Sequence, residues 1–427
     1  MLDQFFKSKA LSGAKLVVQK LLSEQGEANA HSLAHKLMQH FQTLDRKLQL
    51  EFFAFLAAHF NPDPLQVLQA AKDYAVSPGQ QQYIRLFQVV EPARQELLRR
   101  VNRAPGGTAA ILQMRTILLQ ALKSYPEFAA VDADMHHLLS SWFNPGFLEL
   151  HEITWSSPAI LLEKLIAHES VHAIDGWDDL RRRLHPDRRC FAFFHPQLPN
   201  EPLIFVEVAL VPSIATNIQG LLDKQAPVLE KKLFKAAMFY SISNCQPGLR
   251  GVSLGNFLIK RVAERIAQEL PSVKTFCTLS PIPGLNRWLD VGAPLGDAQL
   301  SAATRKRHAA ACAALGLAQQ RWSQQRANGW RPEKSSETIQ AMLQSLCAIY
   351  LVTQSTGEFG DAVARFHLTN GASLHNIHWA ADLSKKGLAQ SAGMMVNYLY
   401  ELDRIEENHA AFINQTVIHA RAIRRWL

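Results

Sequence analysis

One stretch, residues 236–284, constrains the fold most, because it predicts a strand, a loop, a helix and a second strand in direct succession. Its first part, AAMFYSIS at 236–243, is apolar and aromatic enough for a buried strand. Residues 257–270 then repeat apolar side chains at helical spacing until Pro271 ends the pattern. VKTFCTLS at 273–280 predicts the second strand. Strands that alternate with helices in this way indicate a mixed α/β domain.

The loop that joins the first strand to the helix, RGVSLG at 250–255, is suited to bind an anion. Free backbone N–H groups and the positive dipole end at a helix N-terminus attract phosphate. Gly251 and Gly255 let a phosphate approach the backbone closely, and Arg250 adds a positive charge. The same residues also fit an ordinary glycine-containing turn before a surface helix, so the loop alone does not decide between the two.

Several longer segments resemble one known family. The loop is similar to the R-x-x-G-x-G pyrophosphate loop of the acetyltransferase-like coenzyme A fold, with Ser253 at the place of the first glycine. The second strand ends in Ser280 and continues as PIPG. With five further segments, this SPIPG sequence resembles the malonyl-CoA decarboxylase family; the segments are SWFNPGFLEL (141–150), ITWSSPA (153–159), RRCFAFFHP (188–196), FYSIS (239–243) and FHLTNGA (366–372).

The resemblance implies a site. Ser280 and His367 are expected as the catalytic pair, and Ser241 is expected near the malonyl group. Glu169 and His172 are expected to line the substrate site. The coenzyme A contacts are expected from the loop residues Arg250, Gly251, Val252, Ser253, Leu254, Gly255 and Asn256. Some relatives carry an acidic residue where this chain has Ser253, so a carboxylate role at that position does not carry over.

The resemblance also implies a reaction, the conversion of malonyl-CoA to acetyl-CoA and carbon dioxide. The substrate holds a carboxylate β to a thioester carbonyl, so loss of carbon dioxide leaves an enolate that the thioester itself delocalises. The reaction therefore requires neither metal nor biotin, and no cofactor is expected. His367 is the expected proton donor, because an imidazole exchanges protons near neutral pH. Ser280 acts either as a hydrogen-bond donor or as a nucleophile.

The chain is expected to be α+β with two domains. Residues 1–142 predict an all-α helical bundle for packing and oligomerisation, divided by prolines and glycines. Residues 143–427 predict an acetyltransferase-like mixed α/β catalytic domain with a mainly antiparallel sheet and a helical insertion near 290–355. Within it, 190–195 and 202–210 predict a hairpin.

The composition of the chain indicates which binding partners and which cellular compartment to expect. A net charge of +8 and a pI near 9.2 suit a polyanionic substrate such as malonyl-CoA, because a positive surface raises its local concentration. Zinc-finger spacing, RNP aromatics and a basic zipper are missing from the sequence, so nucleic acid is not expected as a partner. No apolar run is long enough to span a membrane, so no membrane partner is expected. The resemblance to the family implies a homo-oligomer. Five scattered cysteines, an odd number, favour a reducing compartment, the cytoplasm.

A competing motif lies at 168–172, where HESVH matches the zinc-peptidase pattern of two histidines one helical turn apart. It falls in a predicted helix, LLEKLIAHESVHAIDGW at 161–177. The pattern is short, and Asp175, Asp178 and Asp179 do not offer a third ligand at a recognised spacing. A zinc metallopeptidase nevertheless stays as an alternative to the decarboxylase. Two further alternatives are an acyl-CoA transferase and a non-catalytic coenzyme A binding protein.

Overall fold

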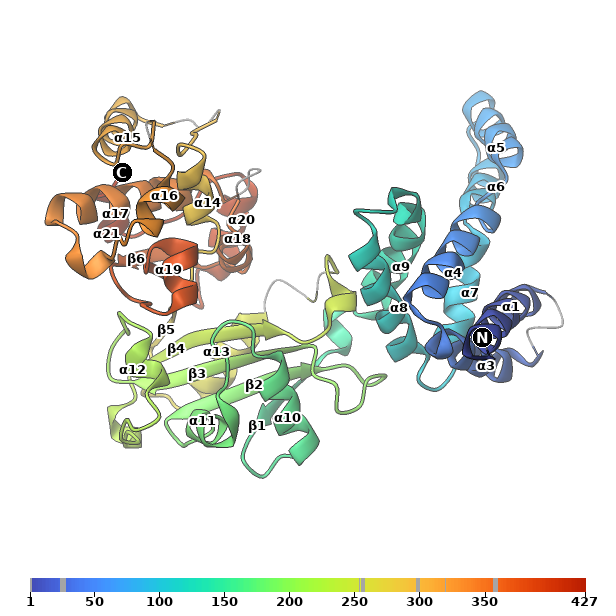
Figure 1. Ribbon diagram of the computed structural model, residues 1–427, viewed down its shortest axis with the longest axis horizontal. Coiled ribbons are helices and arrows are strands. Elements are labelled where there is room, and N and C mark those ends of the chain that lie inside the picture. The colour runs from blue at the N-terminus through green and yellow to red at the C-terminus, as the bar shows by residue number, and fades with distance from the viewer. Residues whose placement is uncertain are drawn as a thin grey trace. The chain divides into compact units, whose positions relative to one another are not determined.

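The computed structural model describes residues 2–23, 28–252, 254, 258–296, 300–318, 320–355 and 360–427. The chain, drawn in Figure 1, divides into two compact units. Unit 1 comprises Met1–Glu149, Phe194–Leu203 and Cys245–Leu254; unit 2 comprises Leu150–Phe193, Ile204–Asn244 and Gly255–Leu427. The domain boundary expected after residue 142 stays a prediction. Among the described residues, no helix has the length and apolar character needed to cross a membrane.

Unit 1 is helical, as the apolar spacing predicts, and its helices break at the expected prolines and glycines. Asp45 and Asp63 start two of them by accepting backbone N–H groups of the first turn. Its elements are α1 (Leu2–Leu22), α3 (Ala30–Thr43), α4 (Arg46–His59), α5 (Pro64–Val76), α6 (Gln80–Val90), α7 (Ala93–Asn102), α8 (Gly107–Ala121) and α9 (Ala129–Trp142), with the 3-10 turns η1 (Pro126–Phe128), η2 (Pro145–Phe147) and η4 (Pro247–Leu249).

The core of unit 1 is aromatic. Phe41 of α3 packs edge-on against Phe52 of α4, and Phe53 contacts both Phe41 and Phe128. All four rings are buried, so each removes a large apolar area from water.

The described residues form one seven-stranded sheet in the order β1-β2-β3-β4-β5-β7-β6 (Figure 1). The β4–β5 pair is parallel, while β2–β3, β3–β4, β5–β7 and β6–β7 are antiparallel. The predicted α+β class, mainly antiparallel sheet and hairpin are therefore confirmed. The strands are β1 (Glu149–Ile153), β2 (Arg188–Phe194), β3 (Ile204–Val211), β4 (Ala236–Asn244), β5 (Thr275–Thr278), β6 (Ser373–His378) and β7 (Met395–Tyr400).

The remaining helices lie between and after these strands along the chain. The predicted helix after the glycine loop is observed as α13, and helices fill the region near 290–355. The elements are α10 (Ala159–His168), α11 (Gly176–Arg183), α12 (Gln219–Leu222), η3 (Lys231–Leu233), α13 (Leu258–Glu269), α14 (Leu285–Asp290), α15 (Ala302–Ala314), α16 (Trp322–Ala327), η5 (Pro332–Lys334), α17 (Glu337–Thr353), α18 (Ala362–Thr369), α19 (Lys385–Ser391), α20 (Ile405–Ile413) and α21 (Arg421–Arg424).

Candidate active site

A cavity of about 300 Å³ lies where β4 and β5 part. The two strands pair in parallel from Ala236↔Thr275 to Phe239↔Thr278. Beyond that point β4 continues to Asn244, whereas Ser280 pairs instead with Val396 of β7. The separation leaves the cavity between the last residues of β4 and the turn after β5. The lining residues are Val171, Ile204, Phe239, Tyr240, Ser241, Ile242, Asn244, Ser280, Pro281, Ala362, Val363, Phe366 and His367.

The structure brings Ser280 and His367 together, although they are 87 residues apart in the sequence. Ser280 Oγ lies 3.0 Å from His367 Nε2. Ser280 follows β5, and His367 projects from the last turn of α18. Both residues are nearly fully buried, at 5% and 3% exposure, yet both line the cavity. A hydroxyl and an imidazole in contact at a cavity wall can donate hydrogen bonds or exchange a proton there.

Aromatic side chains surround the imidazole. Tyr400 Oη lies 2.9 Å from His367 Nδ1, and the Tyr398 ring stacks on the imidazole with centroids 4.6 Å apart. Burial among these groups lowers the pKa of His367 to about 3, because the charged form loses its hydration. His367 is therefore neutral at neutral pH. The proton exchange expected for His367 near neutral pH rests on the ordinary pKa of an imidazole, which this desolvation shifts downward.

Asp361 fixes the position of the helix that carries His367. Its Oδ1 accepts the N–H groups of Val363 and Ala364 at 3.0 and 2.9 Å and so caps α18. Its Oδ2 accepts the N–H of Gly284, at the end of the SPIPG segment, at 2.9 Å. One buried carboxylate therefore joins the turn after Ser280 to the start of the histidine helix. Burial raises the pKa of the Asp361 carboxyl, and the backbone donors oppose that rise.

Two glycines of the quoted segments are explained by close packing. A Cβ on Gly284 would lie 2.0 Å from Tyr350 Oη, so a side chain there would displace the turn after Ser280. Gly371 of the FHLTNGA segment has φ +80°, and a Cβ there would lie 2.2 Å from the carbonyl oxygen of Ile405. Gly284 is therefore needed for the turn after Ser280, and Gly371 for the close packing of its segment on Ile405.

Glu169 holds Ser241 and the loop beside the cavity. Ser241 Oγ donates to the two carboxylate oxygens of Glu169 at 2.8 and 2.7 Å. Glu169 Oε1 also accepts the backbone N–H groups of Val171 and His172 at 2.7 and 2.8 Å. Ser241 and Val171 line the cavity. Burial lowers the pKa of His172 to about 4, and its Nε2 finds no hydrogen-bond partner among the described residues.

This geometry corrects the helix predicted over 161–177, because α10 ends at His168. Glu169 leaves the helical region and turns its carboxylate back onto the next two N–H groups, which competes with continuing the helix. His168 and His172 therefore do not lie one helical turn apart. No group of three or more His, Cys, Asp or Glu side chains within the described ranges is arranged to hold a metal ion.

The expected coenzyme A loop is described only in part. Arg250, Gly251, Val252 and Leu254 belong to unit 1, while Ser253, Gly255 and Asn256 lie outside the described residues. Gly251 adopts φ +83°, a conformation that favours glycine, and its carbonyl oxygen contacts His136 Nε2 at 3.0 Å. Arg250 is exposed.

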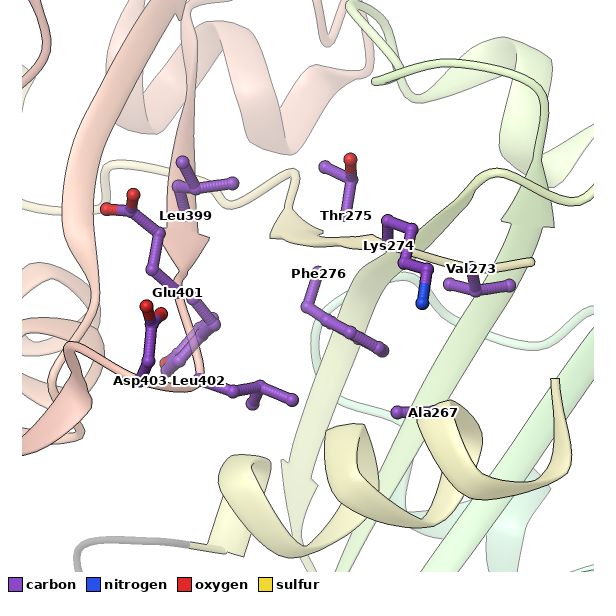
Figure 2. A pocket seen from close by; sticks show the side chains of 10 residues that line it. Ala267, Val273, Lys274, Thr275, Phe276, Leu399, Glu401, Leu402 and Asp403 are labelled. Atoms are coloured by element: carbon purple, nitrogen blue, oxygen red, sulfur yellow. The ribbon is translucent and has the colours of Figure 1, made fainter. Parts of the chain in front are cut away.

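A second hollow, of about 410 Å³, lies beside the ends of β5 and β7. Figure 2 shows Lys274 on the β5 side of it and Glu401 and Asp403 on the β7 side. Tyr400 also lines this hollow, but Ser280 and His367 are not among the described residues that do. Of these two hollows, the first is therefore the one that Ser280 and His367 line.

Three polar residues that contact the site were missed in the sequence: Asp361, Tyr400 and Thr278, whose Oγ1 lies 2.8 Å from Ser280 Oγ. Asp361 carried a signal, since an aspartate directly before the apolar helical pattern AVARFHL is typical of an N-cap. Thr278 and Tyr400 carried none, because a hydroxyl within a strand is not distinctive until its partner is known.

Comparison with known proteins covers nearly the whole chain. The family model described as "Malonyl-CoA decarboxylase C-terminal domain" matches residues 146–427, and "Malonyl-CoA decarboxylase N-terminal domain" matches residues 60–143. The mitochondrial malonyl-CoA decarboxylase of Mus musculus is 36% identical over 369 residues, which are 83% of this chain and 75% of the relative.

Solved structures agree with the sequence relatives. The crystal structure of malonyl-CoA decarboxylase from Rhodopseudomonas palustris is 41% identical, with a TM-score of 0.84 over 97% of this chain and 99% of that one. The enzyme of the same name from Agrobacterium vitis is 40% identical, with a TM-score of 0.82 over 97% and 99% of the two chains. Sequence and fold together show that the chain belongs to the malonyl-CoA decarboxylase family.

Proposed function

We propose that this chain converts malonyl-CoA to acetyl-CoA and carbon dioxide, with Ser280 and His367 at the reacting end of the substrate. The observation that carries the proposal is the 3.0 Å contact between Ser280 Oγ and His367 Nε2 at the wall of the cavity between β4 and β5. The relatives named malonyl-CoA decarboxylase support the same substrate.

The reaction breaks the bond between the substrate's α-carbon and its carboxylate. The electron pair of that bond moves into the thioester, which yields carbon dioxide and an enolate. Hydrogen-bond donors placed at the developing enolate oxygen lower the barrier. His367 Nε2–H, held beside Ser280 Oγ at the cavity wall, is such a donor.

The enolate must then gain one proton, so each turnover consumes a proton. The buried His367 is neutral at neutral pH. A bound carboxylate beside it favours the charged imidazole and raises its pKa, so a proton is taken up with the substrate. We infer that this imidazolium protonates the enolate carbon and that Tyr400 Oη accepts its Nδ1–H meanwhile, across the observed 2.9 Å contact.

The proposed binding region for the malonyl group includes Ser241, Glu169 and His172. Ser241 lines the cavity, and its hydroxyl proton is directed to Glu169. Its oxygen lone pairs are thereby left to face other donors. Glu169 also orders the loop that carries Val171. We propose that this arrangement shapes the part of the cavity that receives the malonyl group.

The segment from Arg250 to Asn256 is proposed to bind the phosphates of coenzyme A, on the strength of the glycine loop and its exposed arginine. Arg250→Ala is expected to raise KM about tenfold and leave kcat within about twofold, because a contact to the non-reacting tail is made equally in ground and transition states. Steady-state kinetics with malonyl-CoA check this, with Arg103→Ala as a surface control. An unchanged KM would remove Arg250 from the binding site.

One assay separates the candidate functions. Purified protein is mixed with malonyl-CoA, with and without a chelator, and acetyl-CoA is followed. Turnover that resists the chelator supports the proposed reaction. Turnover lost with the chelator would indicate metal chemistry, and tight binding without turnover would indicate a coenzyme A binding protein. An acyl-CoA transferase would form product only when an acceptor is added.

We propose that the chain assembles into a homo-oligomer through α5 and α6. The exposed side chains of these helices include Leu65 (77%), Val76 (86%) and Phe87 (60%), and none of residues 80–90, all of them described, is buried. An apolar surface of this kind marks an association site.

The paired substitution Val76→Asp and Phe87→Asp is expected to reduce the oligomer to a smaller species, because it places charges in a desolvated contact. Light scattering after size-exclusion chromatography measures the mass. Leu16→Asp, at another exposed leucine (51%), serves as the control. The proposal fails if the double variant keeps the wild-type mass.

A further inference from the structure

Thr278, the last residue of β5, contacts the catalytic serine from inside the protein. Its Oγ1 accepts the hydroxyl proton of Ser280 at 2.8 Å and the backbone N–H of Tyr398 at 3.1 Å. Thr278 is fully buried, at 0% exposure, so bulk water does not compete for these bonds. Its carbonyl oxygen accepts from Asn397 Nδ2 at 2.6 Å, which fixes the backbone at this point.

The donors of this chain of contacts can be assigned in order. A serine hydroxyl has one proton, and that of Ser280 is directed to Thr278. Ser280 Oγ must therefore be the acceptor in its 3.0 Å contact with His367, so Nε2 carries the proton. In a neutral imidazole Nδ1 is then an acceptor, and Tyr400 donates to it across 2.9 Å.

We propose that Thr278 is a positioning residue that holds the Ser280 proton away from His367 and thereby keeps the imidazole proton on Nε2. The inference rests on the proposed function, in which His367 delivers a proton through Nε2. It also decides how Ser280 acts. In a nucleophilic serine site the hydroxyl donates to the imidazole, which then removes its proton. Here the hydrogen bond runs in the opposite direction, so Ser280 is a hydrogen-bonding group rather than a nucleophile.

The decisive measurement needs no substitution at Thr278. Nitrogen NMR of the ¹⁵N-histidine-labelled wild-type protein distinguishes a protonated ring nitrogen from an unprotonated one, and His367→Gln identifies the relevant signals by their loss. We expect His367 with Nε2 protonated and Nδ1 unprotonated. The opposite tautomer in the wild-type protein would overturn the inference.

Thr278→Val removes the acceptor at nearly constant volume. The Ser280 proton is then expected to turn to Nε2 and the imidazole proton to move to Nδ1. We expect kcat to fall about tenfold to a hundredfold with KM changed less than about threefold, because the reaction loses its positioned donor. Thr278→Ser keeps the hydroxyl and is expected to restore the tautomer and most of kcat.

A chemical probe reports the same switch. An alkyl phosphonofluoridate reacts when the serine oxygen displaces fluoride from phosphorus while a base takes the serine proton. Ser280 of Thr278→Val is expected to be labelled about tenfold faster than that of the wild type, whereas Thr304→Val, a control at another buried threonine, leaves the rate unchanged. Equal labelling of Thr278→Val and wild type would contradict the inference. If the wild-type protein did not turn over malonyl-CoA, the proposed function would be refuted instead, whichever tautomer His367 adopts.

Discussion

His367→Gln is expected to lower kcat for malonyl-CoA about a thousandfold while changing substrate binding less than about threefold. Glutamine can still donate a hydrogen bond to Ser280, but it cannot carry a proton to the enolate carbon. Removing a general acid that acts only in the transition state lowers kcat and kcat/KM together. The variant therefore separates hydrogen bonding by His367 Nε2, which contacts Ser280 at 3.0 Å, from proton transfer.

Stopped assays with excess malonyl-CoA measure kcat, and calorimetry with acetyl-CoA measures binding. His308→Gln, at a half-buried histidine on α15, is the matched control and is expected to keep the wild-type kcat. If His367→Gln weakened binding as much as it lowered kcat, a structural role for His367 would explain the result better than proton donation.

The pattern of apolar residues along the sequence predicted the strand that lines the site and the helix that follows it. The apolar run at 236–243 and the helical spacing at 257–270 are observed as β4 and α13, because each pattern depends on neighbours close in sequence. The prediction of a helix over 161–177 was wrong, because the helix ends at His168 and the side chain of the next residue, Glu169, binds Ser241 of β4. That contact joins residues 72 positions apart, and no local pattern records it.

The candidate pair likewise depends on contacts that local sequence does not predict. Ser280 and His367 were singled out by resemblance, while their contact joins residues 87 positions apart at the point where β4 and β5 part. The low pKa of His367 depends on burial, which the sequence around it does not state. The cytoplasmic location inferred from the cysteines stays a prediction.

Asp361→Ala is expected to damage both stability and catalysis, because one side chain serves both. It leaves the N–H groups of Val363, Ala364 and Gly284 without their buried acceptor. Loss of the α18 cap costs about 1 kcal/mol, and the buried unsatisfied donor left at Gly284 costs about 1–3 kcal/mol, so we expect a loss on the order of 2–4 kcal/mol in the free energy of unfolding.

Catalysis should fall in the variant molecules that remain folded. With the cap gone, α18 and the turn after Ser280 are no longer joined, and a displacement of about 1 Å at a reacting group can cost a hundredfold in rate. Asp361→Asn tests the joining contact separately, because its Oδ1 can still cap α18 while its amide presents N–H groups to Gly284. We expect that variant to keep most of the stability but to lose about tenfold in kcat.

Chemical denaturation and kcat, measured on the same preparations, check both effects. Ser336→Ala removes the cap of α17, whose side chain accepts from Ile339 N, and is expected to lower stability with kcat unchanged. This control isolates the cost of losing a cap from the cost of misplacing His367. Wild-type kcat in folded Asp361→Ala would show that the Ser280–His367 geometry does not depend on this carboxylate, and that other contacts, such as the packing of α18 on α20 and the stacking of Tyr398 on the imidazole, position the helix.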